Sequence, residues 1–216
     1  MNAVHVQSYW PQGTVYGALL NFKREWEVWA PRMNEAPYKG GPKAPVLFIK
    51  TANTFSPSGG AIALPSGVQE VDIGANLAWV MGEDAQPVAC VLMNDVSIPH
   101  ESYYRPPVKY KCIDGFLGVG SKALEIQNLN SDAMVLRVSV NGVLVQRVDY
   151  AQTVRKSRAL LQDIATFMTF QAGDVLMLGS DCLPGGNRPR AKRGDRVEIS
   201  APGFENLANV FAGDGA

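Results

Sequence analysis

The sequence has no excess of charge of either sign. Its 216 residues include 20 Lys and Arg and 20 Asp and Glu, so the formal net charge is zero. Domains that bind nucleic acids usually carry a basic excess, and this class of partner is therefore disfavoured. Hydrophobic residues make up 46% of the chain and charged residues 19%. These proportions exclude a disordered chain and are typical of a domain with a buried core.

Cysteine is also scarce. Cys90, Cys112 and Cys182 form an odd number, are widely spaced and include no Cys-x-x-Cys pair, which disfavours a disulfide framework or a zinc ribbon. Long apolar runs are missing, since the longest, at residues 44–49, is far short of the about 20 residues of a membrane span. The first 13 residues lack the basic and apolar segments of a signal peptide. We therefore expect a cytoplasmic protein that does not associate with membranes.

Short apolar runs of strand length recur along the chain and are separated by turn residues. We expect an N-terminal arm at residues 1–13, a single domain at 14–211 and a tail at 212–216. Strands are expected at residues 15–20, 46–50, 62–64, 76–81, 88–93, 135–140, 143–148, 175–178 and 197–199.

The arrangement of these runs predicts the fold class. Asn141 and Gly142 separate two apolar runs and predict a β-hairpin, because residues of this type accept the positive φ of a tight turn. Helical spacing predicts one main helix at 154–167, and a short helix at 21–30 would end at Pro31. Strands do not alternate with helices, which disfavours a doubly wound parallel sheet. We therefore expect a β-rich α+β domain, a mixed β-sheet rolled on itself.

The densest polar cluster lies at residues 94–115. Asp95 follows an expected strand, where it could hold a metal or a substrate, although a turn leaving the strand is favoured from the local sequence alone. Lys109 and Lys111 are two residues apart, so in an extended chain they would share a face and could bind a small polyanion. Taken alone, two such lysines are more often a solvated face, and that interpretation is favoured.

Two other polar stretches have alternative interpretations. His100 and Glu101 could form an acid–base pair if they lie in a loop. Residues 188–193 (RPRAKR) are basic, but no aromatic residues are interleaved with them, so a solvated loop is favoured over a nucleic-acid site.

A series of short motifs, in their order and spacing, resembles the fumarylacetoacetate hydrolase family from about residue 13 to residue 209. Within the family, the chain is most similar to the N-terminal half or subunit of the branch that acts in 4-hydroxyphenylacetate (homoprotocatechuate) catabolism. The motifs are GALLNF (17–22), PVLFIK (45–50), NLAWVMG (76–82), NDVS (94–97), ESYYRP (101–106), KYKCIDG (109–115) and LGS (178–180).

The resemblance implies a mixed β-roll that forms dimers. It also implies an enzyme in which a divalent metal, commonly Mg²⁺, stabilises an enolate. In this branch the implied reactions are decarboxylation of 5-oxopent-3-ene-1,2,5-tricarboxylate and isomerisation of 2-hydroxyhepta-2,4-diene-1,7-dioate. Family members hold the metal through a Glu-x-Glu pair and an Asp.

Matching the family's functional residues position by position gives a set of expected site residues. Asp95 takes the place of the metal Asp, Lys111 of the catalytic lysine and Ser180 of the catalytic hydroxyl residue. A small polycarboxylate substrate would be bound by four further residues. These are Lys50, Tyr104, Arg105 and Lys109.

The Glu-x-Glu pair is absent, because its two positions hold Gly74 and Asn76. Mg²⁺ needs anionic oxygen ligands, so its affinity for this chain is doubtful. If residues 70–81 were extended, Asp72 and Asn76 could join Asp95 in a partial metal site. Two hypotheses follow. The chain is an isomerase/decarboxylase subunit, in a homodimer or in a heteromer with a homologous subunit that carries Glu-x-Glu. Alternatively, it is a metal-deficient structural subunit that pairs with an active family member.

Overall fold

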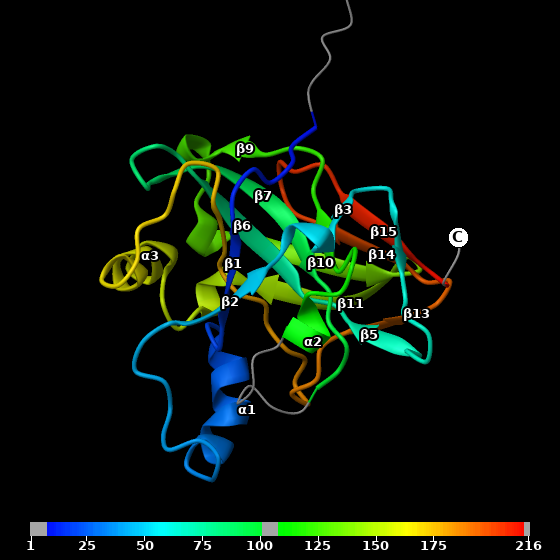
Figure 1. Ribbon diagram of the computed structural model, residues 1–216, viewed down its shortest axis with the longest axis horizontal. Helices are drawn as coiled ribbons and strands as arrows, with labels where there is room; N and C mark the ends of the chain where they lie inside the picture. Colours follow the sequence, from blue (N-terminus) through cyan, green and yellow to red (C-terminus); the bar gives the residue numbers. More distant parts are fainter. Residues whose placement is uncertain (1–7, 101–107, 214–216) are drawn as a thin grey trace, which may run out of the picture.

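A computed structural model describes residues 8–100 and 108–213 of the chain. Its strands form two large sheets and one small one (Figure 1). The first sheet has the order β2-β1-β12-β6-β7-β8-β3, with β9 paired to β7, and the second has the order β11-β10-β14-β15-β4. The third sheet pairs β13 with β5. This strand-rich α+β architecture confirms the predicted fold class.

The strands of the first sheet are β1 Val15–Leu19, β2 Val46–Lys50, β3 Phe55–Pro57, β6 Ala75–Met81, β7 Pro87–Asp95, β8 Leu117–Val119, β9 Leu124–Glu125 and β12 Val175–Met177. The others are β4 Ala61–Ala63, β5 Glu70–Asp72, β10 Val135–Val140, β11 Val143–Asp149, β13 Arg190–Lys192, β14 Arg196–Ser200 and β15 Leu207–Ala212. The α-helices are α1 Lys23–Met33, α2 Val108–Lys111 and α3 Ser157–Ala165. Short 3-10 turns lie at Ala52–Thr54, Ile126–Asn128, Ser131–Ala133 and Tyr150–Gln152.

The first sheet is buried on both faces. Because successive side chains of a strand point to opposite faces, Leu77 and Trp79 of β6 enter the core shared with the second sheet and α3, whereas Ala78 and Val80 enter another apolar cluster on the opposite face. Trp29 of α1 packs against this other cluster, and α1 extends below the sheet in Figure 1. None of the described helices has the length and apolar character needed to cross a membrane.

The hairpin predicted at Asn141 and Gly142 is confirmed. It joins β10 to β11, and the two turn residues have φ values of 51° and 80°. The Asn141 side chain fixes the turn to β14: its Nδ2 donates to Asp195 Oδ1 at 2.8 Å, and its Oδ1 accepts from the Arg196 N–H at 2.9 Å.

We expect Gly142→Ala to lower the free energy of unfolding by about 1–2 kcal/mol, because an L side chain is disfavoured at positive φ. Nothing lies within 4 Å of a Cβ built at Gly142 or at Gly185, but only Gly142 has a left-handed φ. Gly185→Ala is therefore the matched control and should change stability by less than about 0.5 kcal/mol. Urea denaturation checks both variants, and equal effects would contradict the explanation.

The helices differ from the sequence-based expectation. Helix α3 is shorter than residues 154–167, and α1, with 11 residues, is longer than α3, with nine. The prediction that Pro31 ends α1 is wrong, since the helix continues to Met33. Pro31 lies in the last turn, where a missing N–H removes one hydrogen bond from a helix that already packs on the sheet.

Candidate functional site

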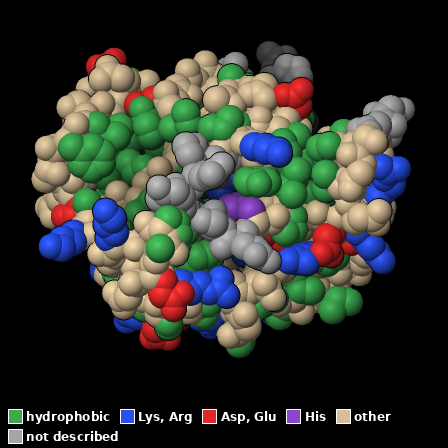
Figure 2. Space-filling view, turned by 60° about the horizontal axis from the view of Figure 1, so that its bottom comes forward, with side chains coloured by type: hydrophobic (Ala, Val, Ile, Leu, Met, Phe, Trp, Pro, Cys, Tyr) green, Lys and Arg blue, Asp and Glu red, His purple; other side chains and the backbone are tan. Residues whose placement is uncertain are grey.

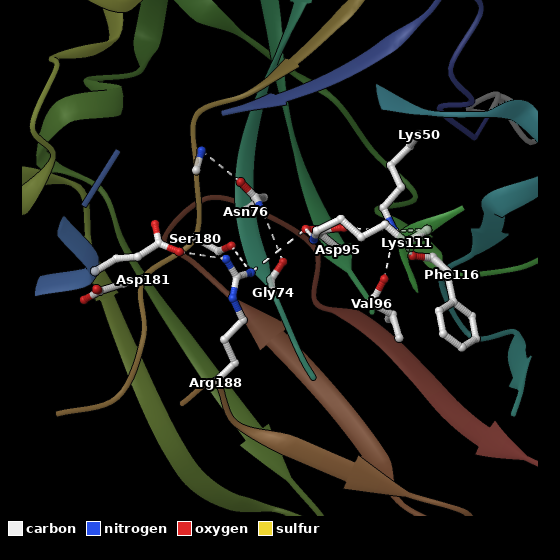
Figure 3. Close-up of polar contacts among 12 residues, drawn as sticks. Lys50, Gly74, Asn76, Asp95, Val96, Lys111, Phe116, Ser180, Asp181 and Arg188 are labelled. Atoms are coloured by element: carbon white, nitrogen blue, oxygen red, sulfur yellow. Dashed lines mark hydrogen bonds and ion pairs between the residues drawn. The ribbon is translucent and has the colours of Figure 1, made fainter. Parts of the chain in front are cut away.

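The site predicted from the sequence forms at one end of the first sheet, where three neighbouring strands bring their termini together. Asp95 ends β7, and its N–H donates to the carbonyl of Gly74, just before β6, at 2.8 Å. Ser180 follows β12, the strand on the other side of β6. Figure 3 shows the side chains of this cluster converging from these strand ends.

Asp95 is the buried centre of the cluster. Its Oδ1 lies 2.9 Å from Lys50 Nζ, and its Oδ2 accepts a short hydrogen bond from Lys111 Nζ. Burial alone would raise the pKa of Asp95, but Lys111, Lys50 and the nearby Arg188 outweigh it and hold the pKa well below its usual range. Asp95 is therefore an ionised carboxylate that is already neutralised by protein cations.

Lys50 lies behind Asp95 and braces the backbone. Its ammonium donates to the carbonyl oxygens of Val96 at 2.8 Å, Lys111 at 2.6 Å and Phe116 at 2.8 Å. Burial lowers the pKa of Lys50, and the Asp95 carboxylate opposes this shift. These contacts give Lys50 a positioning role, so the prediction that it binds substrate directly finds no support in its placement.

Lys111 is the buried lysine that reaches the cavity of the site. It ends the short helix α2, and its Nζ lies 4.5 Å from the centroid of the Phe48 ring. Burial lowers its pKa to about 8, and the neighbouring Arg188 and Lys50 act in the same direction against Asp95. The expectation that Lys109 and Lys111 share a face is wrong, because these residues are helical and Lys109 is exposed.

Arg188 is a central member of this cluster that the sequence interpretation missed. Its Nη1 donates a short hydrogen bond to Ser180 Oγ and lies 4.0 Å from Asp95 Oδ2. Its Nη2 donates to Glu25 Oε1 of α1 at 3.2 Å. Figure 3 shows the Arg188 side chain reaching between Ser180 and Asp95, beside Gly74. The prediction of a solvated loop at residues 188–193 is therefore wrong at Arg188, whose side chain is only 10% exposed, and residues 190–192 form β13.

The two positions of the missing Glu-x-Glu pair are structurally occupied. A Cβ at Gly74 would lie 2.6 Å from the carbonyl oxygen of Asp95 and 2.8 Å from Arg188 Nη1. Asn76 uses both ends of its amide: Nδ2 donates to the Gly74 carbonyl at 3.1 Å, and Oδ1 accepts from the Gly179 N–H at 3.0 Å. Asn76 thus connects β6 to the segment that carries Ser180.

The described residues do not fit a divalent metal. Asp72 lies in β5, which is separate from β6, and its Oδ1 pairs with Arg190 Nε at 3.2 Å. Each of the three residues expected to form a partial metal site, Asp72, Asn76 and Asp95, already has protein partners. Residues 8–100 and 108–213 contain no group of three or more His, Cys, Asp or Glu residues arranged to hold a metal ion. A hard cation such as Mg²⁺ would also meet lysine and arginine cations around Asp95.

A cavity of about 400 Å³ opens in front of Lys111 and Arg188. Arg32, His100 and Arg190 also line it. Among the described lining residues, Asp72 alone carries a carboxylate. Figure 2 shows this face, with Lys and Arg side chains on several sides of a histidine. The excess of cationic groups makes the cavity suited to a small anion.

His100 is held at the edge of this cavity. Its Nδ1 lies 2.9 Å from the Ile98 carbonyl oxygen, and its ring stacks on Tyr110 with the centroids 5.0 Å apart. Burial lowers its pKa. Its expected partner Glu101 and the predicted substrate-binding residues Tyr104 and Arg105 lie outside the described residues.

Comparison with known sequences identifies related proteins. The family described as fumarylacetoacetate (FAA) hydrolase C-terminal matches residues 14–212. The 4-hydroxyphenylacetate degradation bifunctional isomerase/decarboxylase of Escherichia coli is 33% identical over 208 residues, which are 92% of this chain and 47% of that protein. The mitochondrial oxaloacetate tautomerase fahd2 of Xenopus laevis is 32% identical over 64% of this chain and 48% of its own length. The chain thus spans about half the length of these curated relatives.

Solved structures support the same fold. The fumarylacetoacetate hydrolase of Exiguobacterium antarcticum has a TM-score of 0.77 at 21% identity, over 95% of this chain and 76% of that one. The 5-carboxymethyl-2-hydroxymuconate delta-isomerase of Mycobacterium smegmatis has a TM-score of 0.73 at 24% identity, over 94% of this chain and 80% of that one.

Proposed function

Because this chain belongs to the fumarylacetoacetate hydrolase family, we propose that it is a subunit of an isomerase/decarboxylase of 4-hydroxyphenylacetate catabolism. Family members include isomerases, decarboxylases and hydrolases that typically bind a divalent metal. The proposed substrates are 5-oxopent-3-ene-1,2,5-tricarboxylate and 2-hydroxyhepta-2,4-diene-1,7-dioate. The similarity to isomerase/decarboxylases over 92% of the chain supports this proposal.

The cationic cavity is the observation that carries the proposal. Both proposed substrates are small polycarboxylates. The buried Lys111 and the largely buried Arg188 present cations to a cavity large enough for such a molecule. Lys111 and Ser180 remain the proposed catalytic residues. Arg188 donates a hydrogen bond to Ser180 and lies near Asp95, the carboxylate that pairs with Lys111. Lys109 stays a proposed contributor from the exposed side of α2.

We further propose that turnover takes place in a complex with a homologous subunit that carries the Glu-x-Glu pair. The chain spans about half of its bifunctional relatives, and its described residues do not fit Mg²⁺. A heteromer would supply a metal site of a kind that residues 8–100 and 108–213 of this chain do not form, whereas a homodimer would carry the same Gly74 and Asn76 twice.

The purified chain with Mg²⁺ should therefore show little decarboxylation and should gain activity when a Glu-x-Glu-bearing homologue is added. The measurement is the rate of loss of the tricarboxylate, for each protein alone and for the mixture. High Mg²⁺-dependent turnover by the chain alone, abolished by Asp95→Ala, would contradict the need for a partner.

A structural subunit without catalysis is the alternative, and the missing metal carboxylates favour it. The double variant Lys111→Met with Ser180→Ala distinguishes the two functions in the same mixture. Loss of activity with the complex still assembled supports catalysis by this chain, whereas unchanged activity supports the structural role.

A further inference from the structure

The guanidinium of Arg188 lies next to the point where a side chain at position 74 would begin. Its Nη1 is 2.8 Å from a Cβ built at Gly74 and 4.0 Å from Asp95 Oδ2. A protein cation thus lies beside both the first position of the missing Glu-x-Glu pair and the retained Asp95.

We propose that the guanidinium of Arg188 is a built-in replacement for the metal ion, and that with Lys111 it binds a small carboxylate anion without any metal. The inference takes its ligand class from the proposed function. It goes further because it assigns the positive charge that binds the ligand to Arg188 and Lys111 of this chain and not to a bound metal ion.

The surroundings hold the guanidinium in place. Glu25 and Ser180 accept hydrogen bonds from Nη2 and Nη1, and both residues are buried, at 3% and 4% exposure. Gly74 leaves the space that the guanidinium needs. Such a fixed fork presents N–H donors in one plane, which matches the geometry of a carboxylate.

The charges around Asp95 favour an arginine over a metal. Lys50 and Lys111 already pair with the two oxygens of this carboxylate. A divalent ion at this point would be repelled by both ammonium groups and would find the carboxylate engaged. A guanidinium carries a single delocalised charge and is anchored by Glu25. Arg188 and Lys111 then face the same cavity with two different donor types.

Calorimetric titration of the full chain with oxalate, a planar dicarboxylate, tests the inference. Wild-type protein is titrated in EDTA and in Mg²⁺, together with Arg188→Gln, Arg188→Lys and Arg196→Gln. Arg196 is an exposed arginine of β14 paired with Glu198, and it is not among the described residues that line the cavity, so its variant changes the net charge equally outside that lining.

We expect equal oxalate affinity in EDTA and in Mg²⁺, at least tenfold weaker binding by Arg188→Gln, and unchanged binding by Arg196→Gln. If Arg188→Gln does not fold, as judged by circular dichroism, Arg188→Lys decides: it keeps the charge but loses the fork, so binding should still weaken several-fold.

The inference would be overturned if oxalate bound only in Mg²⁺ or did not bind in either buffer. It would also be overturned if Arg196→Gln lost as much oxalate affinity as Arg188→Gln. These results are distinguishable from a failure of the proposed function, which is decided separately by turnover in the mixture with a homologous subunit. Oxalate could bind as proposed even if that mixture were inactive.

Discussion

Asp95→Ala is expected to lower the free energy of unfolding by about 3–5 kcal/mol, because removing one partner of a buried ion pair leaves the other charge uncompensated. Here two ammonium groups, those of Lys50 and Lys111, would lose their shared carboxylate inside the protein. Lys50 would keep its three carbonyl acceptors, whereas Lys111 would keep only its contact with the Phe48 ring among the contacts described above.

Urea denaturation measures this effect, and Asp163→Ala is the matched control. Asp163 also pairs with a cation, at 2.7 Å from Arg155 Nε, but its side chain is 49% exposed. Exposed pairs contribute about 0–1 kcal/mol, so Asp163→Ala should have a small effect. A loss below about 1 kcal/mol in Asp95→Ala would show that the cluster is not held by its charges.

Restoring the family's metal carboxylates by Gly74→Glu with Asn76→Glu should destabilise the chain by about 3 kcal/mol or more. The new Cβ at position 74 would press against the Asp95 carbonyl, a backbone atom that cannot move aside easily. Loss of the Asn76 amide would remove two buried hydrogen bonds. Because Arg188 and Lys111 stay in place, we also expect the variant to gain no Mg²⁺-dependent rise in melting temperature.

Thermal melting with and without Mg²⁺ checks both parts of this expectation. Gln127→Glu with Gln152→Glu is the control, since it adds the same charge at two exposed residues and should change stability by less than about 1 kcal/mol. A stable Glu-x-Glu variant whose melting temperature rises with Mg²⁺ would show that the site accepts a metal after all.

Most of the apolar strands could be predicted from the sequence, including the three-residue strands β4 and β12, but β5 and β13 could not. The runs that became β2, β6, β7 and the β10–β11 hairpin have enough β-branched and aromatic residues to indicate strands. Strands such as β5 and β13 have three residues each. They exist because they pair with each other across 120 residues of chain, and no local pattern reports such a pairing.

Within the candidate site, the sequence predicted only the residues that lie in the family motifs. Asp95, Lys111 and Ser180 do come together, although no motif indicates that Lys50 would brace the backbone behind them. Arg188 lies in a basic stretch without an apolar or aromatic pattern, and its partner Glu25 is 163 residues away in sequence. A buried ion pair between two such distant segments is a property of the tertiary fold alone.

The bracing role of Lys50 changes how motif residues in this chain should be interpreted. One ammonium joins the end of β2 to the backbone at Val96, Lys111 and Phe116, so selection for a folded chain is enough to retain both Lys50 and Asp95. Their presence alone is therefore no evidence of metal chemistry in this chain. With Arg188 proposed to replace the metal, the position to inspect in a related chain is residue 188, which lies outside every motif, together with a residue as small as glycine at position 74.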